Sequence, residues 1–395
     1  MEENRKIQAS AGGSFRTLII HDLNTEDELN RIIPDRDGMR VISDDCTIHP
    51  CVGCFGCWNR DPGRCVIKDG YENMGFLIHH AEEVRVISRY TYGGFSSFVK
   101  NVFDRSLGYV LPHFEIVEGE MHHRKRYAED KPFTFYFYGD NIGSEEKETA
   151  KRYVKAVCTN IRGTVKEVVF LDSESETKKE PLLPMDRDEK VAMLNCSMRK
   201  KNSYKLALEL EKKLGKETVL LNLSEFHNNH PGLAKDLEEV SDIVLCTPLY
   251  VDGLPSQLIR FLEFWGKEYH GSSKRIYCLA NMGLYESQQL KNLLSQVRQW
   301  TTAMDFSYCG SLAVGAGELV GAFLDMGRID LRPLTGINKA MEELAEAIGK
   351  GETAEDIYSG PTHFPRSLYL VIANSGWSRQ GKKNGLRKED LFRKL

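Results

Sequence analysis

The sequence predicts an α/β protein with two doubly wound, five-stranded parallel sheets in tandem. Short apolar runs rich in β-branched residues alternate with longer segments of helical periodicity, which is the pattern of parallel βαβ units. The alternation breaks off once, at residues 172–187, and then begins again. At 395 residues the chain is long for one hydrophobic core and long enough for two domains.

The expected strands are nearly continuous apolar runs, as in a sheet that is covered on both faces. In the first half they are residues 16–21, 39–43, 84–88, 133–138 and 164–171. In the second half they are residues 190–195, 218–221, 243–247, 275–280 and 306–314. Helical periodicity fills the intervals and includes residues 97–104, 145–159, 204–213, 256–265 and 288–300. Residues 112–132 show no period, and we expect a long irregular loop there.

These elements divide the chain into four parts. We predict a first domain over residues 14–171 and a second domain over residues 188–350. Residues 172–187, where charge dominates and two prolines occur, are the expected linker. Residues 351–395 open with a mixed segment, carry apolar residues at helical spacing after Pro365, and end in a basic run. We expect a helical tail there, docked on the domains or on a second subunit of a homodimer.

Two features indicate a structural repeat. In each half a strand is followed by a turn with tyrosine and glycine and then by a helix, at residues 88–105 and 247–265. In each half another strand ends in a short turn, at residues 138–140 and 281–283. Doubly wound sheets bind ligands at the carboxyl ends of their strands, where these turns are expected. Two unrelated α/β domains remain the alternative.

Composition excludes several classes of protein. The formal net charge is −4, so neither a nucleic acid nor a membrane surface is the expected main partner. No apolar run approaches the roughly 18 residues that a membrane span requires. The polar start of the chain does not resemble a signal peptide, and we expect a cytoplasmic protein.

The start of the second domain resembles a phosphate site. Residues 195–203 lie between an expected strand and an expected helix. A phosphate there would meet the hydroxyl groups of Ser197 and Ser203, the amide of Asn202 and the free N–H groups of the helix start. Arg199 and its two lysine neighbours add positive charge. A capped helix with solvated basic residues is the alternative.

Three loops of the second domain together resemble those of the flavodoxin-like NAD(P)H-dependent FMN reductases. Residues 195–203 match the first loop of that family, except that Cys196 replaces the usual glycine. Residues 247–255 resemble the second loop, which would lie against the isoalloxazine ring, and 281–283 resemble the third. The resemblance implies two flavodoxin-like sheets and FMN contacts from Pro248, Leu249, Tyr250, Val251, Gly253, Asn281 and Gly283, in addition to the phosphate-loop residues.

The first domain has a well-formed ring loop but a first loop that is unsuited to a phosphate. Tyr92 and Gly93 belong to a well-formed ring loop of the same family, although Arg89 stands at the usual proline position. The first loop, residues 21–28, lacks glycine and arginine and carries four carboxylates, which would repel a phosphate. We therefore place FMN in the second domain and leave open whether the first also binds flavin.

Five of the ten cysteines crowd between residues 46 and 65. Cys51, Cys54 and Cys57 follow one another at intervals of three, and Cys65 comes eight residues later. Three thiolates so spaced, with a fourth from a following turn, can surround one iron–sulfur cluster. Zinc sites more often use two separated pairs, so the spacing fits zinc less well. Reduced thiols that only pack a loop are the remaining alternative, and Cys46 is a spare thiol outside the run.

Residues 40–110 resemble iron–sulfur flavoproteins, another flavodoxin-like group. These carry a compact cysteine run in the same place, which holds a 4Fe-4S cluster next to FMN, and the resemblance extends to Asp104 and Arg105. It implies that Cys51, Cys54, Cys57 and Cys65 are cluster ligands.

The sequence thus predicts an FMN-dependent oxidoreductase that takes electrons from NAD(P)H, with a cluster that relays electrons to FMN. The acceptor would be a small molecule or a redox partner protein. A reductase in which the cysteines are incidental and a non-catalytic flavin-binding electron carrier are the alternatives. No residue is assigned a catalytic role.

Overall fold

The computed structural model describes residues 15–140, 142–173, 182, 190–269 and 271–395. The chain folds into two compact units: Met1–Glu176 together with Leu370–Leu395, and Thr177–Tyr369. The segment predicted as a linker, 172–187, lies outside the described residues except for residue 182 and for residues 172 and 173, which end the last strand of the first unit.

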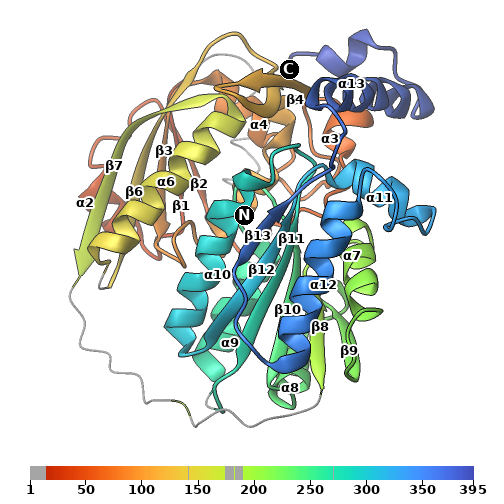
Figure 1. Ribbon diagram of the computed structural model, residues 1–395. Helices are drawn as coiled ribbons and strands as arrows, with labels where there is room; N and C mark the ends of the chain where they lie inside the picture. Colours follow the sequence, from red (N-terminus) through yellow and green to blue (C-terminus); the bar gives the residue numbers. More distant parts are fainter. Residues whose placement is uncertain (1–14, 141, 174–181, 183–189, 270) are drawn as a thin grey trace. The chain divides into compact units, whose positions relative to one another are not determined.

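The first unit contains a five-stranded parallel sheet in the order β2-β1-β3-β6-β7 (Figure 1). Its strands are β1 (Phe15–His21), β2 (Met39–Ser43), β3 (Ala81–Arg89), β6 (Lys131–Asp140) and β7 (Gly163–Ser173). The helices between them are α2 (Glu26–Ile32), α3 (Gly56–Asn59), α4 (Met74–His80), α5 (Ser97–Asp104), η1 (Leu107–Tyr109) and α6 (Ser144–Ile161). This is the flavodoxin-like strand order, so the fold class predicted for the first half is confirmed.

One expectation for this unit is wrong. Most of the predicted irregular loop over 112–132 is an antiparallel hairpin of β4 (Val110–Val117) and β5 (Glu120–Lys125). The two residues that join the strands, Glu118 and Gly119, have φ values of 50° and 89°. Positive φ at both central positions is the geometry of tight hairpin turns, and glycine adopts it without steric cost.

The core of the first unit is rich in aromatic side chains. Phe95, which follows β3, stacks on Phe135 and Phe137 of β6, with ring centroids 5.7 and 5.8 Å apart. Phe103 of α5 and Tyr153 of α6 pack against the same Phe95 ring, with centroids at 5.0 and 5.1 Å. All five rings are buried, so the sheet is fixed to α5 and α6 through one cluster.

The second unit contains a six-stranded parallel sheet in the order β13-β12-β11-β10-β8-β9. Its strands are β8 (Val191–Asn195), β9 (Thr218–Asn222), β10 (Asp242–Pro248), β11 (Arg275–Asn281), β12 (Ser307–Val314) and β13 (Asp356–Ser359). Five of them repeat the flavodoxin-like order of the first sheet, which confirms the fold class. The sixth, β13, was not predicted. It is an edge strand of four half-buried residues, so it has no apolar run to reveal it.

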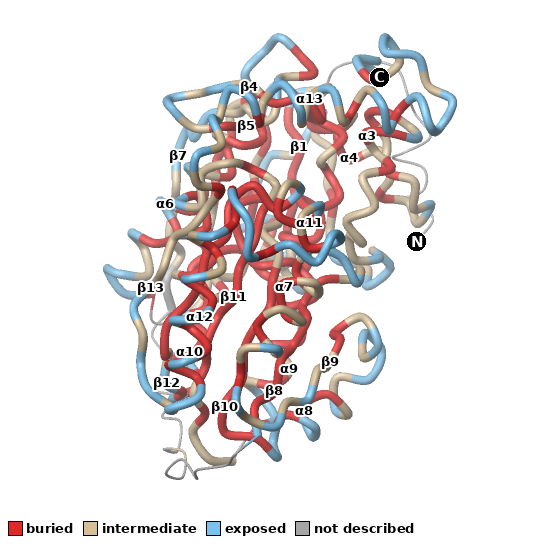
Figure 2. The backbone as a smooth tube through the Cα atoms, turned by 45° about the vertical axis from the view of Figure 1, so that its right-hand side comes forward, coloured by how far each residue is buried: buried red, intermediate tan, exposed pale blue. Residues whose placement is uncertain are grey.

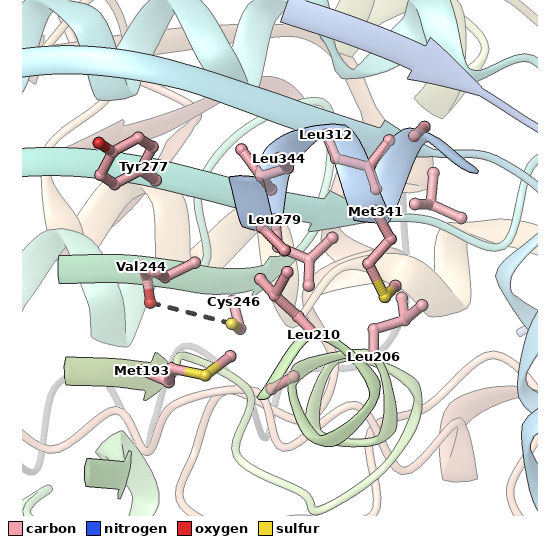
Figure 3. Packing of buried hydrophobic residues seen from close by; sticks show 14 of the residues in the cluster. Met193, Leu206, Leu210, Val244, Cys246, Tyr277, Leu279, Leu312, Met341 and Leu344 are labelled. Carbon is pink, nitrogen blue, oxygen red and sulfur yellow. Dashed lines mark hydrogen bonds between the residues drawn. The ribbon is translucent and has the colours of Figure 1, made fainter. Parts of the chain in front are cut away.

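Helices cover both faces of this sheet. They are α7 (Asn202–Glu211), η2 (Leu223–Glu225), α8 (His230–Glu238), α9 (Ser256–Glu268), η3 (Ser287–Leu290), α10 (Lys291–Met304), α11 (Gly317–Asp325) and α12 (Thr335–Lys350). On one face Leu206 of α7 and Met341 of α12 pack against Met193 and Leu279 (Figure 3). Figure 2 shows the central strands β8, β10 and β11 buried along their length.

The C-terminal segment belongs to both units in turn. Residues 351–395, expected as a helical tail, include β13, then α13 (Arg366–Lys383) and η4 (Glu389–Phe392). The first residues of α13 lie in the second unit, and the chain from Leu370 onward lies in the first. Among the described residues, no helix is both long and apolar enough to cross a membrane.

Candidate functional site

The strand order locates a candidate binding edge in each sheet. In both sheets the chain order reverses between the first strand and its two neighbours, at β1 with β3 and at β8 with β10. Loops on opposite sides of such a switch point diverge and leave a crevice outside the carboxyl ends of the strands. The predicted phosphate and ring loops of the second unit follow β8 and β10, so both lie at this edge.

The two ring loops have the same backbone geometry. In the first unit Thr91 and Gly94 exchange backbone hydrogen bonds of 3.0 Å around Tyr92 and Gly93, whose φ values are 48° and 85°. In the second unit Tyr250 and Gly253 do the same at 3.1 and 3.0 Å around a two-residue turn with φ values of 37° and 59°.

The backbone hydrogen bonds that join the start of each loop to the next strand of the sheet are repeated as well. The N–H of Tyr90 donates to Tyr138 O, and the N–H of Leu249 donates to Asn281 O, both at 2.8 Å. The loops therefore form a true repeat, as the sequence pattern predicted.

The first unit carries a carboxylate at its switch point. The backbone N–H of Arg89 donates to both oxygens of Asp22, at 3.0 and 3.2 Å. Burial raises the pKa of Asp22, although hydrogen bonds involving Ser96 and Arg89 oppose that rise. Asp22 follows β1 directly, where a phosphate would approach, and an ionised carboxylate there repels a dianion. A carboxylate at this position disfavours phosphate binding at the switch point of the first sheet.

The loop between β8 and α7 is folded by its own polar groups. The Ser197 N–H donates to Asn195 Oδ1 at 3.4 Å, and the Arg199 N–H donates to Ser197 Oγ at 3.2 Å. Cys196, the residue that replaces the family's glycine, is fully buried, and its carbonyl accepts from Gln257 of α9 at 3.4 Å. Within the described chain, no side chain caps the start of α7, so N–H groups of its first turn point toward the loop.

Two residues predicted to face the phosphate also tie loops together. Ser203 Oγ donates to Asn281 Oδ1 at 2.6 Å, which joins the phosphate loop to the third loop. Asn202 Nδ2 donates to Gly317 O at 2.9 Å, which joins it to α11. Their side chains thus join the loops at this edge, and a bound phosphate would be left with the backbone N–H groups, Ser197 and the cations.

Cations gather around the first turn of α7. Arg199, Lys201 and Lys205 lie close enough to Glu318 of α11 to interact electrostatically with its carboxylate. Lys205 also pairs with Asp325 at 2.5 Å, and the exposed Lys200 pairs with Glu225 at 2.9 Å. Because Asp325 pairs with Lys205, the groups that favour an anion at this position are Arg199, Lys201 and the positive end of the α7 dipole.

The ring loop and the third loop complete the edge. Pro248, Leu249 and Tyr250 are partly exposed, whereas Val251 is buried. Asn281 joins both neighbouring loops, because its carbonyl accepts from Leu249 and its side chain accepts from Ser203. The predicted residues of all three loops therefore lie along one edge of the second sheet.

Sequence reasoning missed several residues that hold this edge. The hydroxyl of Tyr369, in the first turn of α13, donates to Gly283 O at 2.5 Å. Gln296 of α10 accepts from the Leu254 N–H at 2.8 Å. A Cβ at Gly317 would lie 2.8 Å from Met282 O, so only glycine lets α11 approach the third loop this closely. The glycine-containing run 310–318 was a signal in the sequence for the close contact at Gly317. The hydrogen bonds of Tyr369 and Gln296 join residues far apart in the chain, so no local pattern indicates them.

The four predicted cluster ligands line one cavity in the first unit. Cys51, Cys54, Cys57 and Cys65 surround it together with Asp104 and Arg105 at the end of α5. Cys46, outside the run, is exposed and has a φ of 59°. The structure thus brings together the four cysteines that the spacing grouped, and it leaves the fifth apart.

The thiols of this site influence one another. Burial raises the pKa of Cys57 well above its ordinary value, and the neighbouring Cys51, Cys65 and Cys54 raise it further. Burial likewise raises the pKa of Cys51 to about 12, with a further contribution from Asp104. Thiols in such surroundings do not ionise near neutral pH unless a cation or a metal compensates their charge.

Arg105 connects α5 to both sides of the cysteine loop. Its Nε donates to Cys65 Sγ at 3.1 Å, and its Nη1 donates to His49 O at 2.7 Å. Both Nη atoms also bind the carboxylate of Asp69, at 2.7 and 2.8 Å. Although burial opposes it, the hydrogen bonds with Asp69 and Cys65 and the negative charge of Asp69 raise the pKa of Arg105, so the guanidinium stays charged beside the sulfur.

The four cysteines share one cavity but are not arranged around a single ion. Among the residues that the structure describes, no three His, Cys, Asp or Glu side chains are grouped so as to hold one ion. A single zinc would need its four sulfur ligands about 2.3 Å from one centre. The four cysteines line one cavity, and Cys65 and Cys54 accept N–H hydrogen bonds from Arg105 and Gly56.

Beside the cysteines, Lys100 and Asp104 form an ion pair whose side chains are both fully buried. Removing one partner leaves the other charge in a medium of low polarity. We predict that Lys100→Met lowers the free energy of unfolding of the first unit by about 3–5 kcal/mol. Urea denaturation measures the loss, and the double variant Lys100→Met/Asp104→Leu should recover most of it. Equal losses in the single and double variants would contradict this assignment.

Comparison with known proteins gives weak structural likenesses only. No family model and no curated protein matches the chain. The Trp repressor binding protein of Bacillus subtilis aligns with a TM-score of 0.29 and 16% identity, over 36% of this chain and 97% of that protein. An azoreductase of Bacillus anthracis aligns with a TM-score of 0.30 and 12% identity, over 41% and 100%. An NAD(P)H:quinone oxidoreductase of Methanothermobacter marburgensis aligns with a TM-score of 0.22 and 11% identity, over 48% and 92%.

Proposed function

We propose that this chain is an FMN-dependent oxidoreductase that takes electrons from NAD(P)H and carries an iron–sulfur cluster in its first unit. The observation that carries the flavin assignment is the convergence of three loops at the switch point of the second sheet, tied together through Asn281. FMN would supply hydride acceptance and one-electron transfer when bound, and a 4Fe-4S cluster would supply single-electron transfer.

The roles of the residues follow from their positions. The first turn of α7, Ser197 and Arg199 would hold the FMN phosphate by N–H donors, a hydroxyl group and positive charge. The partly exposed Pro248, Leu249 and Tyr250 would lie along the isoalloxazine ring, and Gly283 would border it. In the first unit Tyr92 and Gly93 repeat the ring loop, but Asp22 disfavours a second flavin phosphate.

Cys51, Cys54, Cys57 and Cys65 would be the cluster ligands. The charged Arg105 beside Cys65 offsets part of the negative charge that four thiolates bring into a buried site. The acceptor would be a small molecule or a redox partner protein.

The test is reduction of the purified chain under anaerobic conditions. Addition of NADPH or NADH should bleach the flavin absorbance and then turn over with a small acceptor such as a quinone. Bleaching without turnover would favour the alternative of an electron carrier that serves a partner protein. No response to either nucleotide, in protein that contains flavin, would contradict NAD(P)H as the donor.

Arg105→Gln is expected to weaken the cluster without changing the flavin. Loss of a hydrogen-bonding neighbour of a metal ligand costs about 10–100-fold in metal affinity. Iron per chain during titration with a chelator measures this loss, and the reduction potential should shift in the same variant. Arg105→Lys keeps the charge but not the fork that binds Asp69 and Cys65 together, so we expect an intermediate loss. Unchanged iron retention in Arg105→Gln would remove Arg105 from the site.

A further inference from the structure

The C-terminal residues of the chain pack on the cysteine loop of the first unit. Trp377 of α13 is only 8% exposed. Its ring lies edge-on to Phe55, with centroids 5.4 Å apart, and edge-on to Trp58, at 5.3 Å. Phe55 and Trp58 are themselves stacked at 5.4 Å. Because Phe55 follows Cys54 and Trp58 follows Cys57, the three rings sit directly against the cysteine run.

Hydrogen bonds from α13 and from Asn384, the residue that follows it, also fix this segment to the first unit. Asn59 Nδ2 donates to Gln380 Oε1 at 3.1 Å, and Asn384 Nδ2 donates to Asn59 O at 2.8 Å. Asn374 pairs with both backbone groups of Phe114 in β4, accepting at 2.7 Å and donating at 3.1 Å. The segment is therefore fixed both to the cysteine loop, at Asn59, and to β4, at Phe114.

Residues 391–393 also hold this segment against the first unit. Arg393 donates to Pro62 O at 2.7 Å and pairs with Asp61, both from the turn between Cys57 and Cys65. Arg126 of the first unit donates to Leu391 O at 3.1 Å and to Arg393 O at 2.7 Å, which holds the end of the chain in place. A buried guanidinium bound to two carbonyls of the chain end is a specific anchor.

We propose that residues 370–395 are part of the cysteine site, and that Trp377 is a positioning residue for Cys54 and Cys57. The segment spans the loop between the second and the fourth cysteine and shields it from water. Without it, Phe55 and Trp58 would lose a buried aromatic neighbour, and the short α3, which follows Phe55 and contains Trp58, would be free to open. Insofar as the bound group is an iron–sulfur cluster, this inference rests on the proposed function; the fixing of the thiols does not.

The consequence is a protected site. Solvent access is one of the determinants of cluster potential and lifetime, and thiol reactivity depends on access in the same way. Opening of the loop should therefore speed both oxidative loss of the cluster and modification of the free thiols.

The test uses the 395-residue chain with Trp377→Ala. The control is Ile372→Ala, because Ile372 is on the same helix but is 42% exposed. The first readout is the rate at which a maleimide labels Cys54 and Cys57 in protein freed of iron, followed by peptide mass spectrometry. We expect on the order of tenfold faster labelling in Trp377→Ala, since local opening governs access. Ile372→Ala should match the parent, and Trp377→Phe should restore most of the protection.

The second readout is the lifetime of the cluster absorbance in air, which we expect to shorten in Trp377→Ala while flavin content stays constant. Arg393→Ala provides a milder variant at the chain end, should Trp377→Ala fail to fold by circular dichroism. Parent-like labelling in both variants would overturn the inference. A parent protein without iron would instead refute the proposed cluster, and the labelling rates would still decide whether the C-terminal segment protects the thiols.

Discussion

Cys57→Ala is expected to abolish iron binding. The Cys57 thiol is surrounded by the other three cysteines of the run, and each of them affects its pKa. Loss of one of four ligands leaves a cluster with an open iron, which is readily lost. Iron and acid-labile sulfide should fall from about four each per chain to background. Flavin content should not change, because the phosphate loop and the ring loop proposed to hold FMN belong to the second unit.

Cys46→Ala is the matched control. Cys46 is an exposed cysteine just before the same run, and it does not line the cavity. It should keep the iron content of the parent. Iron that survives in Cys57→Ala, or that disappears equally in Cys46→Ala, would contradict the assigned ligand set.

Charge reversal at the start of α7 is expected to weaken FMN binding by at least about 100-fold, since hydrogen bonds to charged groups contribute roughly 1.5–3 kcal/mol each. The variant is Arg199→Glu/Lys201→Glu. Acidic residues at a helix N-terminus favour the helix, so the loss would not come from unfolding of α7. Fluorescence quenching of added FMN measures the dissociation constant.

Lys212→Glu/Lys235→Glu provides the control with the same change in net charge. Both lysines are exposed, one at the C-terminal end of α7 and the other in α8. This variant should bind FMN like the parent. Equal weakening in both variants would mean a general electrostatic effect, and no weakening in either would remove the phosphate from this loop.

The two parallel sheets could be predicted because the strands are apolar runs and the intervals have helical period. β8, for example, is buried at all five positions, and its sequence shows no polar alternation before Asn195. β13 escaped prediction because none of its four residues is fully buried. The hairpin of β4 and β5 escaped because histidines and Pro112 obscure its alternation, although Glu118 and Gly119 between the strands were a turn signal.

At the candidate sites, groupings of residues close in sequence could be predicted, whereas contacts between distant residues could not. The cysteines of the cavity are neighbours in sequence, so their spacing was enough to group them. The Ser203–Asn281 hydrogen bond joins residues 78 positions apart, and Asn59–Gln380 joins residues 321 positions apart. Such contacts depend on the completed fold and leave no local pattern. The position of Asn202 in the phosphate loop is a local feature and could be predicted. Its hydrogen bond to Gly317 is a long-range contact and could not.

The most direct test of the account is an absorbance spectrum of the anaerobically purified chain, with flavin, iron and sulfide determined on the same sample. We predict flavin bands with a broad shoulder at longer wavelength, about one FMN, and about four irons and four sulfides per chain. Flavin without iron would leave a plain FMN reductase and remove the cluster. A colourless protein that also fails to take up added FMN would contradict the central claim.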